Sequence, residues 1–263
     1  MSFKVFLEES YKGWKLVRKC IASLDELELL EDKCASCDFC TLICPREALS
    51  FEHDQNGGRK RLVVNSKECS FCGYCVAFCP FHALELRSNK KPVIPVVEQG
   101  VCQPLIRQGQ VEVIAEDAVE KCPSCYICVV QCPQEAISLK FMDGIPRLLI
   151  DYNKCAGCRS CRLNCPVCII KSYPAFEGTL EVDLEQAQQF GSELAKICPM
   201  ACFAVDDDGV LSHSDDACVF CGACQYVPGA PKGMIVVRRT SMLALAPLSA
   251  AVIDEIKKAF LTF

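Results

Sequence analysis

The residues that could do chemistry in this chain are cysteines, and their spacing repeats. Cys34, Cys37, Cys40 and Cys44 stand three, three and four residues apart, and Pro45 follows at once. Three closely spaced cysteines with a fourth before proline form the pattern that holds a [4Fe-4S] cluster through thiolate sulfur. Iron held in this way takes up and releases single electrons. The run therefore indicates one-electron chemistry.

The same run returns three times, and a partial copy follows. The full copies are Cys69, Cys72, Cys75, Cys79 and Pro80; Cys122, Cys125, Cys128, Cys132 and Pro133; and Cys155, Cys158, Cys161, Cys165 and Pro166. The partial copy keeps Cys198 before Pro199 but has no triplet ahead of them. Its second half has a triplet, with Pro228 near the place of the fourth cysteine. That triplet is Cys218, Cys221 and Cys224.

The fourth cysteine of each run is expected to serve a different cluster from the first three. In two-cluster ferredoxins it ligates the cluster of the other run. The first two runs then give one cluster on Cys34, Cys37, Cys40 and Cys79, and a second on Cys69, Cys72, Cys75 and Cys44. The next two runs give a third on Cys122, Cys125, Cys128 and Cys165, and a fourth on Cys155, Cys158, Cys161 and Cys132.

The partial copy tests this rule. Crossed pairing leaves one of its clusters without any ligand and the other with all four. Those four are Cys198, Cys218, Cys221 and Cys224. A pattern that had decayed by chance would leave partial sets, so we predict five [4Fe-4S] clusters as the cofactors.

Four of the 24 cysteines are left over, namely Cys20, Cys102, Cys168 and Cys202. Their wide and irregular separation argues against a sixth cluster. Free cysteine often packs as a small hydrophobic residue. Cys202 stands where other runs have alanine and Cys168 takes a neighbouring position, so both are expected to serve packing.

Other interpretations of the cysteines fit less well. Zinc sites use pairs of Cys-x-x-Cys rather than triplets with a remote Cys-Pro. A disulfide framework is typical of short secreted chains, whereas the first residues here carry acidic side chains and no apolar signal core. Clusters that only hold the fold together would not need to number five in a chain of 263 residues. Free thiolates need a reducing compartment, so we expect the cytoplasm of a cell that lives with little oxygen.

Charge and hydropathy limit the kinds of partner that the sequence predicts. The formal net charge is −5, and five oxidised clusters of about −2 each would bring it to about −15. Such a surface repels nucleic acid and favours basic or oppositely charged patches on partner proteins. No apolar run approaches the roughly 20 residues that span a bilayer. The longest, residues 242–253, is broken by Pro247, so we expect no membrane span.

The sequence predicts no catalytic residues. His53, His82 and His213 lie in predicted turns and loop ends, which favours a surface position. The chain has no glycine-rich phosphate loop and no flavin or nicotinamide fingerprint.

Short strands and turns surround the runs, which predicts an α+β fold. Period-two apolar segments follow four of the five Cys-Pro pairs, at 48–51, 83–86, 136–139 and 202–205. Turn signals at 54–58, 143–144 and 206–209 predict hairpins that return at 61–64, 147–150 and 210–211. Each unit is thus a strand, a cluster loop, a short helix and a strand.

Two units make one module, and three modules follow. They are the two-cluster modules 34–88 and 122–173 and the one-cluster module 179–240. Residues 1–33 are expected to form a cap and a strand that leads into the first run, and 89–121 a linker and a further leading strand. The proline-rich part of the linker, 89–110, is expected to lie extended on the surface.

Two helices are expected outside the cluster loops. One, at 184–197, would fill the core that the missing cluster loop vacates. Its apolar positions at helical spacing are Leu184, Ala187, Phe190, Leu194 and Ile197. The C-terminal residues 241–263 are expected to hold the other, with an apolar face at 248–261.

With these repeats laid out, residues 34–240 resemble the polyferredoxins, which are tandem bacterial-type two-cluster ferredoxin modules. Segments 155–166 and 217–240 are most similar to the polyferredoxin subunit of formylmethanofuran dehydrogenase, followed by the polyferredoxins of methanogen hydrogenase complexes. The resemblance implies an electron carrier that is not itself an enzyme. It would wire a low-potential donor protein to a catalytic subunit of an anaerobic, methanogenic redox complex.

Two other functions stay open. They are a redox-sensing, assembly or regulatory iron-sulfur subunit, and a catalytic iron-sulfur enzyme. An enzyme would need a cluster with an open iron position, whereas every predicted cluster has four cysteines.

Overall fold

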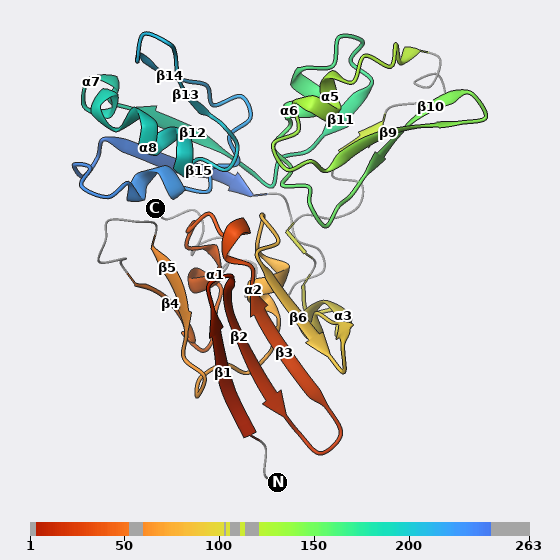
Figure 1. The fold of residues 1–263 in the computed structure, drawn as a ribbon, viewed down its shortest axis with the longest axis vertical. Coiled ribbons are helices and arrows are strands. Elements are labelled where there is room, and N and C mark those ends of the chain that lie inside the picture. Colours follow the sequence, from red (N-terminus) through yellow and green to blue (C-terminus); the bar gives the residue numbers. More distant parts are fainter. Residues whose placement is uncertain (1–3, 53–59, 103, 106–110, 114–120, 243–263) are drawn as a thin grey trace. The chain divides into compact units, whose positions relative to one another are not determined.

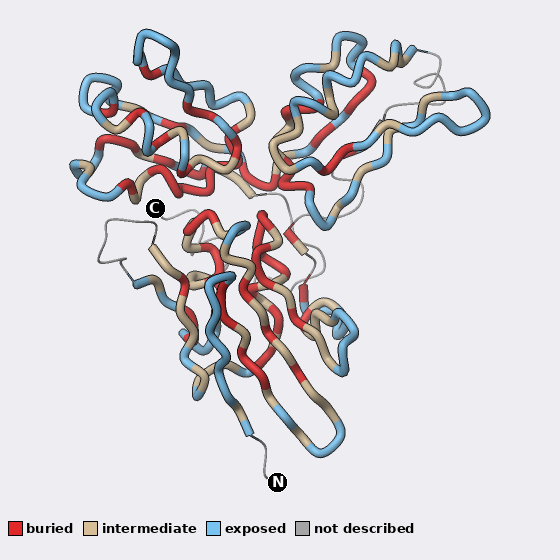
Figure 2. Tube along the Cα trace, in the orientation of Figure 1, coloured by how far each residue is buried: buried red, intermediate tan, exposed pale blue. Residues whose placement is uncertain are grey.

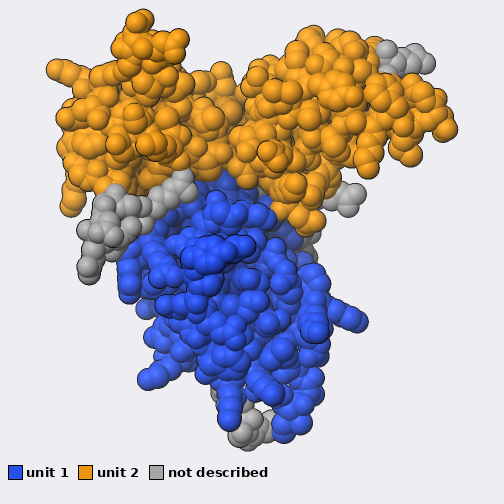
Figure 3. Space-filling model, in the orientation of Figure 1, with its two compact units in different colours: residues 1–105, 244–263 blue, residues 106–243 orange. Residues whose placement is uncertain are grey.

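The computed structural model describes residues 4–52, 60–102, 104–105, 111–113 and 121–242. The chain forms two compact units, residues 1–105 with 244–263 and residues 106–243 (Figure 3). The first predicted module falls in the first unit and the other two fall in the second. The predicted turn at 54–58 and the predicted helix at 248–261 lie outside the described residues.

An antiparallel sheet of five strands runs through the first unit in the order β1-β2-β3-β6-β7 (Figure 1). Its strands are β1 Lys4–Ser10, β2 Gly13–Lys19, β3 Leu24–Leu29, β6 Leu84–Ser88 and β7 Lys91–Pro92. The sequence predicts only a cap and one strand before the first run. Three strands form there because β3 pairs with β6, the strand that follows Cys79, and β2 and β1 extend the same ladder.

Trp14, on β2, joins this sheet to a hairpin made of β4 Leu49–Glu52 and β5 Arg61–Val64. Its side chain is 3% exposed. The indole N–H donates to the carbonyl oxygen of Leu62 at 2.7 Å. A single side chain thus supplies both apolar packing and a buried hydrogen bond between the N-terminal strands and the first predicted module.

Replacing Trp14 by alanine is expected to lower the free energy of unfolding by about 3–5 kcal/mol, as for other buried large-to-small changes. Trp14→Phe keeps much of the ring volume but leaves the Leu62 carbonyl without its donor, so a smaller loss of about 1–3 kcal/mol is expected. Thermal midpoints of the two variants, followed by far-UV circular dichroism under anaerobic conditions, check the order. Equal losses would contradict this account of Trp14.

The second unit consists of two-stranded antiparallel ladders in its described part. They pair β8 Val111–Val113 with β11 Ile170–Ser172, β9 Ile137–Met142 with β10 Ile145–Ile150, β12 Phe176–Val182 with β15 Ile235–Met242, and β13 Phe203–Val205 with β14 Leu211–His213. Figure 2 shows buried residues along the paired strands and exposed residues at the tip of the β9–β10 hairpin.

Strands form at all four predicted positions after Cys-Pro. β4, β6, β9 and β13 each begin within one residue of the predicted segment, and β5, β10 and β14 return where expected. Asp143 and Gly144 have φ of 53° and 77° between β9 and β10. Two left-handed residues in a two-residue loop match the twist of a hairpin, so the turn prediction at 143–144 is confirmed.

Short helices follow the cluster loops as predicted. Each begins two residues after the second cysteine of a triplet. They are α1 Phe39–Leu42, α2 Tyr74–Ala77, α5 Ile127–Val130, α6 Ser160–Leu163 and the 3-10 helix η3 Ala223–Tyr226. A further 3-10 helix, η1 Glu31–Lys33, leads into the first run.

The prediction that residues 89–110 form an extended linker is wrong for those of them that the structure describes. After β7 the chain forms α3 Pro95–Glu98, which has proline in its first turn. Val96 donates its backbone N–H to the Cys72 carbonyl at 3.1 Å, and Leu105 donates to Ala77 at 2.7 Å. This segment folds onto the second triplet because its few apolar side chains are buried there. Its proline-rich composition gives no sign of this packing.

The helix predicted at 184–197 is present but interrupted. It consists of α7 Leu184–Ala187, the 3-10 helix η2 Gln188–Phe190 and α8 Gly191–Ile197. Leu194 is fully buried, as predicted, whereas Leu184 is 47% exposed. At the interruption, the side-chain amide of Gln188 donates to the Gly209 carbonyl at 2.7 Å and accepts from the Leu211 N–H at 3.0 Å. No helix in the described residues is both long and apolar enough to cross a membrane.

Candidate metal centres

The first predicted ligand set lines one cavity in the first unit. Cys34, Cys37, Cys40 and Cys79 surround a space of about 310 Å³, its open mouth included. Apolar side chains of β3, β4, β5 and β6 form much of the remaining wall. Burial raises the pKa of Cys40 well above its usual value, and the neighbouring thiols add to the shift. The crossed cysteine, Cys79, thus lies with the first triplet.

The second set lines a separate cavity in the same unit. Cys69, Cys72 and Cys75 surround it together with Cys44, the last cysteine of the first run. Its volume is about 380 Å³, open mouth included. Burial raises the pKa of Cys75, and charge on the other three thiols contributes. Cys44 therefore faces the second triplet although it follows the first in the chain.

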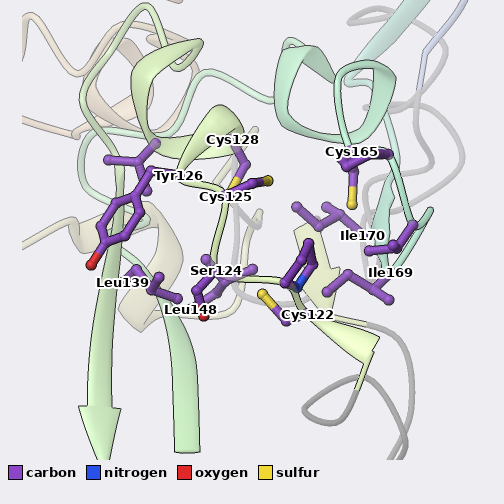
Figure 4. A pocket seen from close by; sticks show the side chains of 14 residues that line it. Cys122, Ser124, Cys125, Tyr126, Cys128, Leu139, Leu148, Cys165, Ile169 and Ile170 are labelled. Atoms are coloured by element: carbon purple, nitrogen blue, oxygen red, sulfur yellow. The ribbon is translucent and has the colours of Figure 1, made fainter.

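The third set lines a cavity of about 360 Å³ in the second unit. Figure 4 shows the sulfur atoms of Cys122, Cys125, Cys128 and Cys165 directed toward the same space. Leu139 and Leu148 line it from below, and they face each other across the β9–β10 ladder. The hairpin thus forms one apolar wall of this site.

The fourth set is brought together by the same crossing. Burial raises the pKa of Cys158 to about 11 and that of Cys161 to about 12, and charge on Cys132 contributes to both shifts. Arg159, directly after Cys158, has its Nε buried without a hydrogen-bond partner in the described part of the chain. A buried donor of this kind requires an acceptor. An anionic cluster held by the four thiolates would supply such an acceptor, so these residues fit a cluster of that kind.

The fifth set lines a cavity of about 320 Å³, and a fifth thiol lines it too. Cys198, Cys218, Cys221 and Cys224 are joined there by Cys202. The neighbouring Cys202 thiol lowers the pKa of Cys198 to about 6 and also lowers the pKa of Cys218. The sequence predicts packing for Cys202. The structure places its buried thiol inside the site.

All five triplet loops follow one backbone path. The residue before the central cysteine and the residue after it have positive φ in every loop. The pairs are Ser36 and Asp38, Phe71 and Gly73, Ser124 and Tyr126, Gly157 and Arg159, and Phe220 and Gly222. For residues other than glycine this backbone costs about 1–3 kcal/mol and persists where the surroundings demand it. Because the same strained backbone recurs in all five loops, we infer that all five are shaped to hold the same kind of group.

A second repeated contact concerns the cysteine of each Cys-Pro. The backbone N–H four residues later donates to its sulfur at 3.2 Å in three runs and at 3.3 Å in the partial copy. The donors are Ala48, Ala83, Ala136 and Cys202. N–H donors aimed at sulfur stabilise its thiolate form, which is the form that binds iron.

The arrangement of these thiols is compatible with a polynuclear cluster. Among the described residues no three Cys, His, Asp or Glu side chains converge tightly enough to share one metal ion. A four-iron cube needs no such convergence, because each thiolate binds its own iron.

Two arginines contact the triplet loops, and the sequence analysis did not single them out. Arg18, on β2, donates to the Ser70 carbonyl at 3.3 Å, and its guanidinium lies 4.4 Å from the Phe71 ring centre. Arg239, on β15, donates to the carbonyls of Phe220 and Cys221 at 2.8 and 3.0 Å. A signal existed, because only these two triplets read Cys-x-Phe-Cys-Gly-x-Cys.

The leftover cysteines do not share one place. Cys102, 2% exposed, lies near Cys72 in the first unit, and burial raises its pKa to about 11. Cys202 lies in the fifth site, in the second unit. Cys20 is partly exposed and Cys168 is exposed. The packing role predicted for Cys168 is therefore wrong.

Two comparisons with known proteins found a similarity to this chain. Residues 33–83 match the family described as the 4Fe-4S dicluster domain. No curated protein sequence matches the chain. Among solved structures, a chain of the formate dehydrogenase–heterodisulfide reductase–formylmethanofuran dehydrogenase complex from Methanospirillum hungatei superposes with a TM-score of 0.82 and 22% identity, over 98% of this chain and 91% of that chain. Residues 33–83 thus carry the sequence pattern of the 4Fe-4S dicluster domain, and nearly the whole chain shares its fold with that chain of the complex.

Proposed function

We propose that this chain is an electron-transfer polyferredoxin that carries five [4Fe-4S] clusters on the five cysteine sets described above. The observation that supports it most is the repetition of one loop geometry at all five triplets, with a distant Cys-Pro cysteine beside each. When bound, such clusters supply reversible one-electron chemistry. Five sites in one chain suit conduction over a distance better than they suit stabilisation of a fold.

The residues around each site have distinct tasks in this proposal. The four thiolates hold the irons, and the crossed cysteine ties two distant parts of a module together. Apolar side chains exclude water, while N–H donors reach sulfur and arginines place positive charge nearby. These are the factors that set the reduction potential of an iron-sulfur site. Every set has four cysteines, so each serves electron transfer rather than substrate binding.

The partners are inferred from the matched structure. Its chain belongs to a complex of formate dehydrogenase, heterodisulfide reductase and formylmethanofuran dehydrogenase. We infer that the present chain works within a comparable anaerobic redox complex, between a low-potential donor and a catalytic subunit. Purifying the native complex anaerobically and identifying the other subunits tests this part of the proposal directly.

Reduction tests the electron-carrier function. Dithionite is expected to bleach the visible absorbance of the anaerobically purified chain and to give an EPR spectrum broadened by interacting clusters. The two clusters of one module share crossed ligands from the same two runs, so their spins are expected to couple. Failure of dithionite to reduce the protein contradicts the carrier proposal, and a single isolated EPR signal favours the redox-sensing or assembly alternative.

Loss of the fifth cluster is expected when Cys198 and Cys202 are both replaced by alanine. The double change removes the fourth ligand and the neighbouring thiol that could substitute for it. Iron should fall by about four atoms per chain, the content of one [4Fe-4S] cluster. Iron analysis of this variant beside Cys20→Ser, which changes a cysteine outside every set, measures the difference. Unchanged iron in the double variant would refute the assignment of Cys198.

A further inference from the structure

The third site is the most exposed of the four sites whose cavities are described above. All twenty predicted ligands lie in the described part of the chain, and Cys125 is the one among them that is exposed. Four more exposed residues line its cavity, namely Pro123, Tyr126, Pro166 and Val167. No exposed residue lines the first or the fifth cavity, and the exposed residues that line the second are Arg46 and Ser70.

Apolar side chains surround this exposed ligand. Tyr126, at the start of α5, is 45% exposed, and Ile127 and Val130 of α5 are 38% and 78% exposed. Val167, beyond Cys165 on the other side of the cavity, is 38% exposed. Figure 4 shows the Tyr126 ring directed away from the sulfur atoms. An exposed apolar patch with an aromatic side chain next to a functional site is typical of a surface that binds another protein.

The charge of this module differs from that of the rest of the chain. Residues 121–172 contain seven basic and three acidic side chains, whereas the remaining residues contain 21 and 30. Two bound clusters of about −2 each would leave the module near neutral, while the rest becomes strongly negative. The segments on either side of the third site, 121–133 and 159–170, have no acidic residue, and Lys121 and Arg162 are exposed there. This face therefore suits an acidic partner.

We propose that the surface around Cys125, Tyr126 and Val130 is the docking face for an acidic one-electron carrier protein, which exchanges electrons with this chain at the third site. This inference rests on the proposed function. Electron transfer slows steeply with distance, so a partner reaches a site with an exposed ligand more readily than a buried one. In each transfer the cofactor of the carrier loses one electron and the chain gains it at the third site, or the reverse. Basic side chains attract the acidic face, and the apolar patch excludes water from the contact.

Stopped-flow mixing of the full, cluster-loaded chain with a small acidic two-[4Fe-4S] bacterial ferredoxin tests this, one protein being reduced and the other oxidised. Val130→Asp and Arg162→Glu are each expected to lower the second-order rate constant about tenfold at low salt, with iron content unchanged. The matched controls Val210→Asp and Arg238→Glu change exposed side chains of the third module and are expected to leave the rate unchanged. The effect of Arg162→Glu should shrink as salt is raised, because salt screens exposed charges.

Loss of single clusters locates the exchange. Cys128→Ala, which removes a ligand of the third cluster, is expected to slow exchange with the ferredoxin at least tenfold. Cys40→Ala, which removes a ligand of the first, should leave the initial rate unchanged. Dithionite should still reduce the remaining clusters in both variants.

Equal rates in wild type, Arg162→Glu and Cys128→Ala would overturn the inference and leave the proposed function standing. A wild-type chain that dithionite reduces but that exchanges no electrons with the ferredoxin also contradicts the inference. A dimer in solution that Val130→Asp dissociates would assign this face to a second copy of the chain instead. Failure of dithionite to reduce the wild-type chain contradicts the proposed function itself, and the inference with it.

Discussion

Replacing Cys44 by alanine is expected to remove the second cluster and to leave the first in place, although Cys44 belongs to the first run. Cys44 lines the cavity of Cys69, Cys72 and Cys75, not that of the first triplet. Iron should fall by about four atoms per chain. The reason is geometric, because the chain turns after α1 and carries Cys44 to the other site.

Double variants make this prediction sharp. Cys44→Ala with Cys75→Ala removes two ligands of one cluster, so iron should fall no further than with Cys44→Ala alone. Cys44→Ala with Cys40→Ala removes ligands of two clusters, so the loss should reach about eight atoms. Alkylation of the native Cys44→Ala protein, read by mass spectrometry, should mark Cys69 and Cys72 rather than Cys34. The reverse pattern would show that pairing is not crossed.

Arg239→Gln is expected to destabilise the second unit by about 3 kcal/mol, since hydrogen bonds from a charged donor to two buried carbonyls are lost. Arg239 is 7% exposed, and its guanidinium lies 5.4 Å from the ring centre of Phe176. Its loss also removes a positive charge beside the loop that holds Cys221. A lower reduction potential of the fifth cluster is therefore expected together with a lower thermal midpoint.

The neighbouring residue supplies the control. Arg238 stands on the exposed face of the same strand and pairs with Glu181 at 3.3 Å, with 56% of its side chain exposed. An exposed ion pair contributes about 0–1 kcal/mol, so Arg238→Gln should change neither the midpoint of unfolding nor the potential appreciably. Equal effects of the two substitutions would contradict the role assigned to Arg239.

Local features of the fold were predictable because they depend on local chemistry. The strands after each Cys-Pro, the turn at Asp143 and Gly144 and the short helices all follow from patterns of a few residues. The N-terminal sheet was not, since its three strands form through pairing of β3 with β6, far along the chain. The fold of residues 91–102 and 104–105 was not predictable either. Their composition is typical of linkers, yet Cys102 and Leu105 are buried.

The sites, like the fold, have one part that the sequence predicts and another that it does not. Cysteine spacing predicts which four thiols share a site, because the triplet and the crossed Cys-Pro cysteine can be read directly from the sequence. The surroundings of a site come from elsewhere in the chain, as with Arg18 from β2 and Arg239 from β15. The unusual cysteine at position 202 was visible when the runs were aligned, yet only the structure shows that it lines the fifth site.

Iron and acid-labile sulfide in the anaerobically purified chain test the central claim most directly. Five [4Fe-4S] clusters predict about 20 atoms of each per chain, since every cluster contributes four of both. Zinc analysis of the same sample should find none bound in stoichiometric amount. A content near 16 would remove one of the five sites, and zinc without sulfide would contradict the account as a whole.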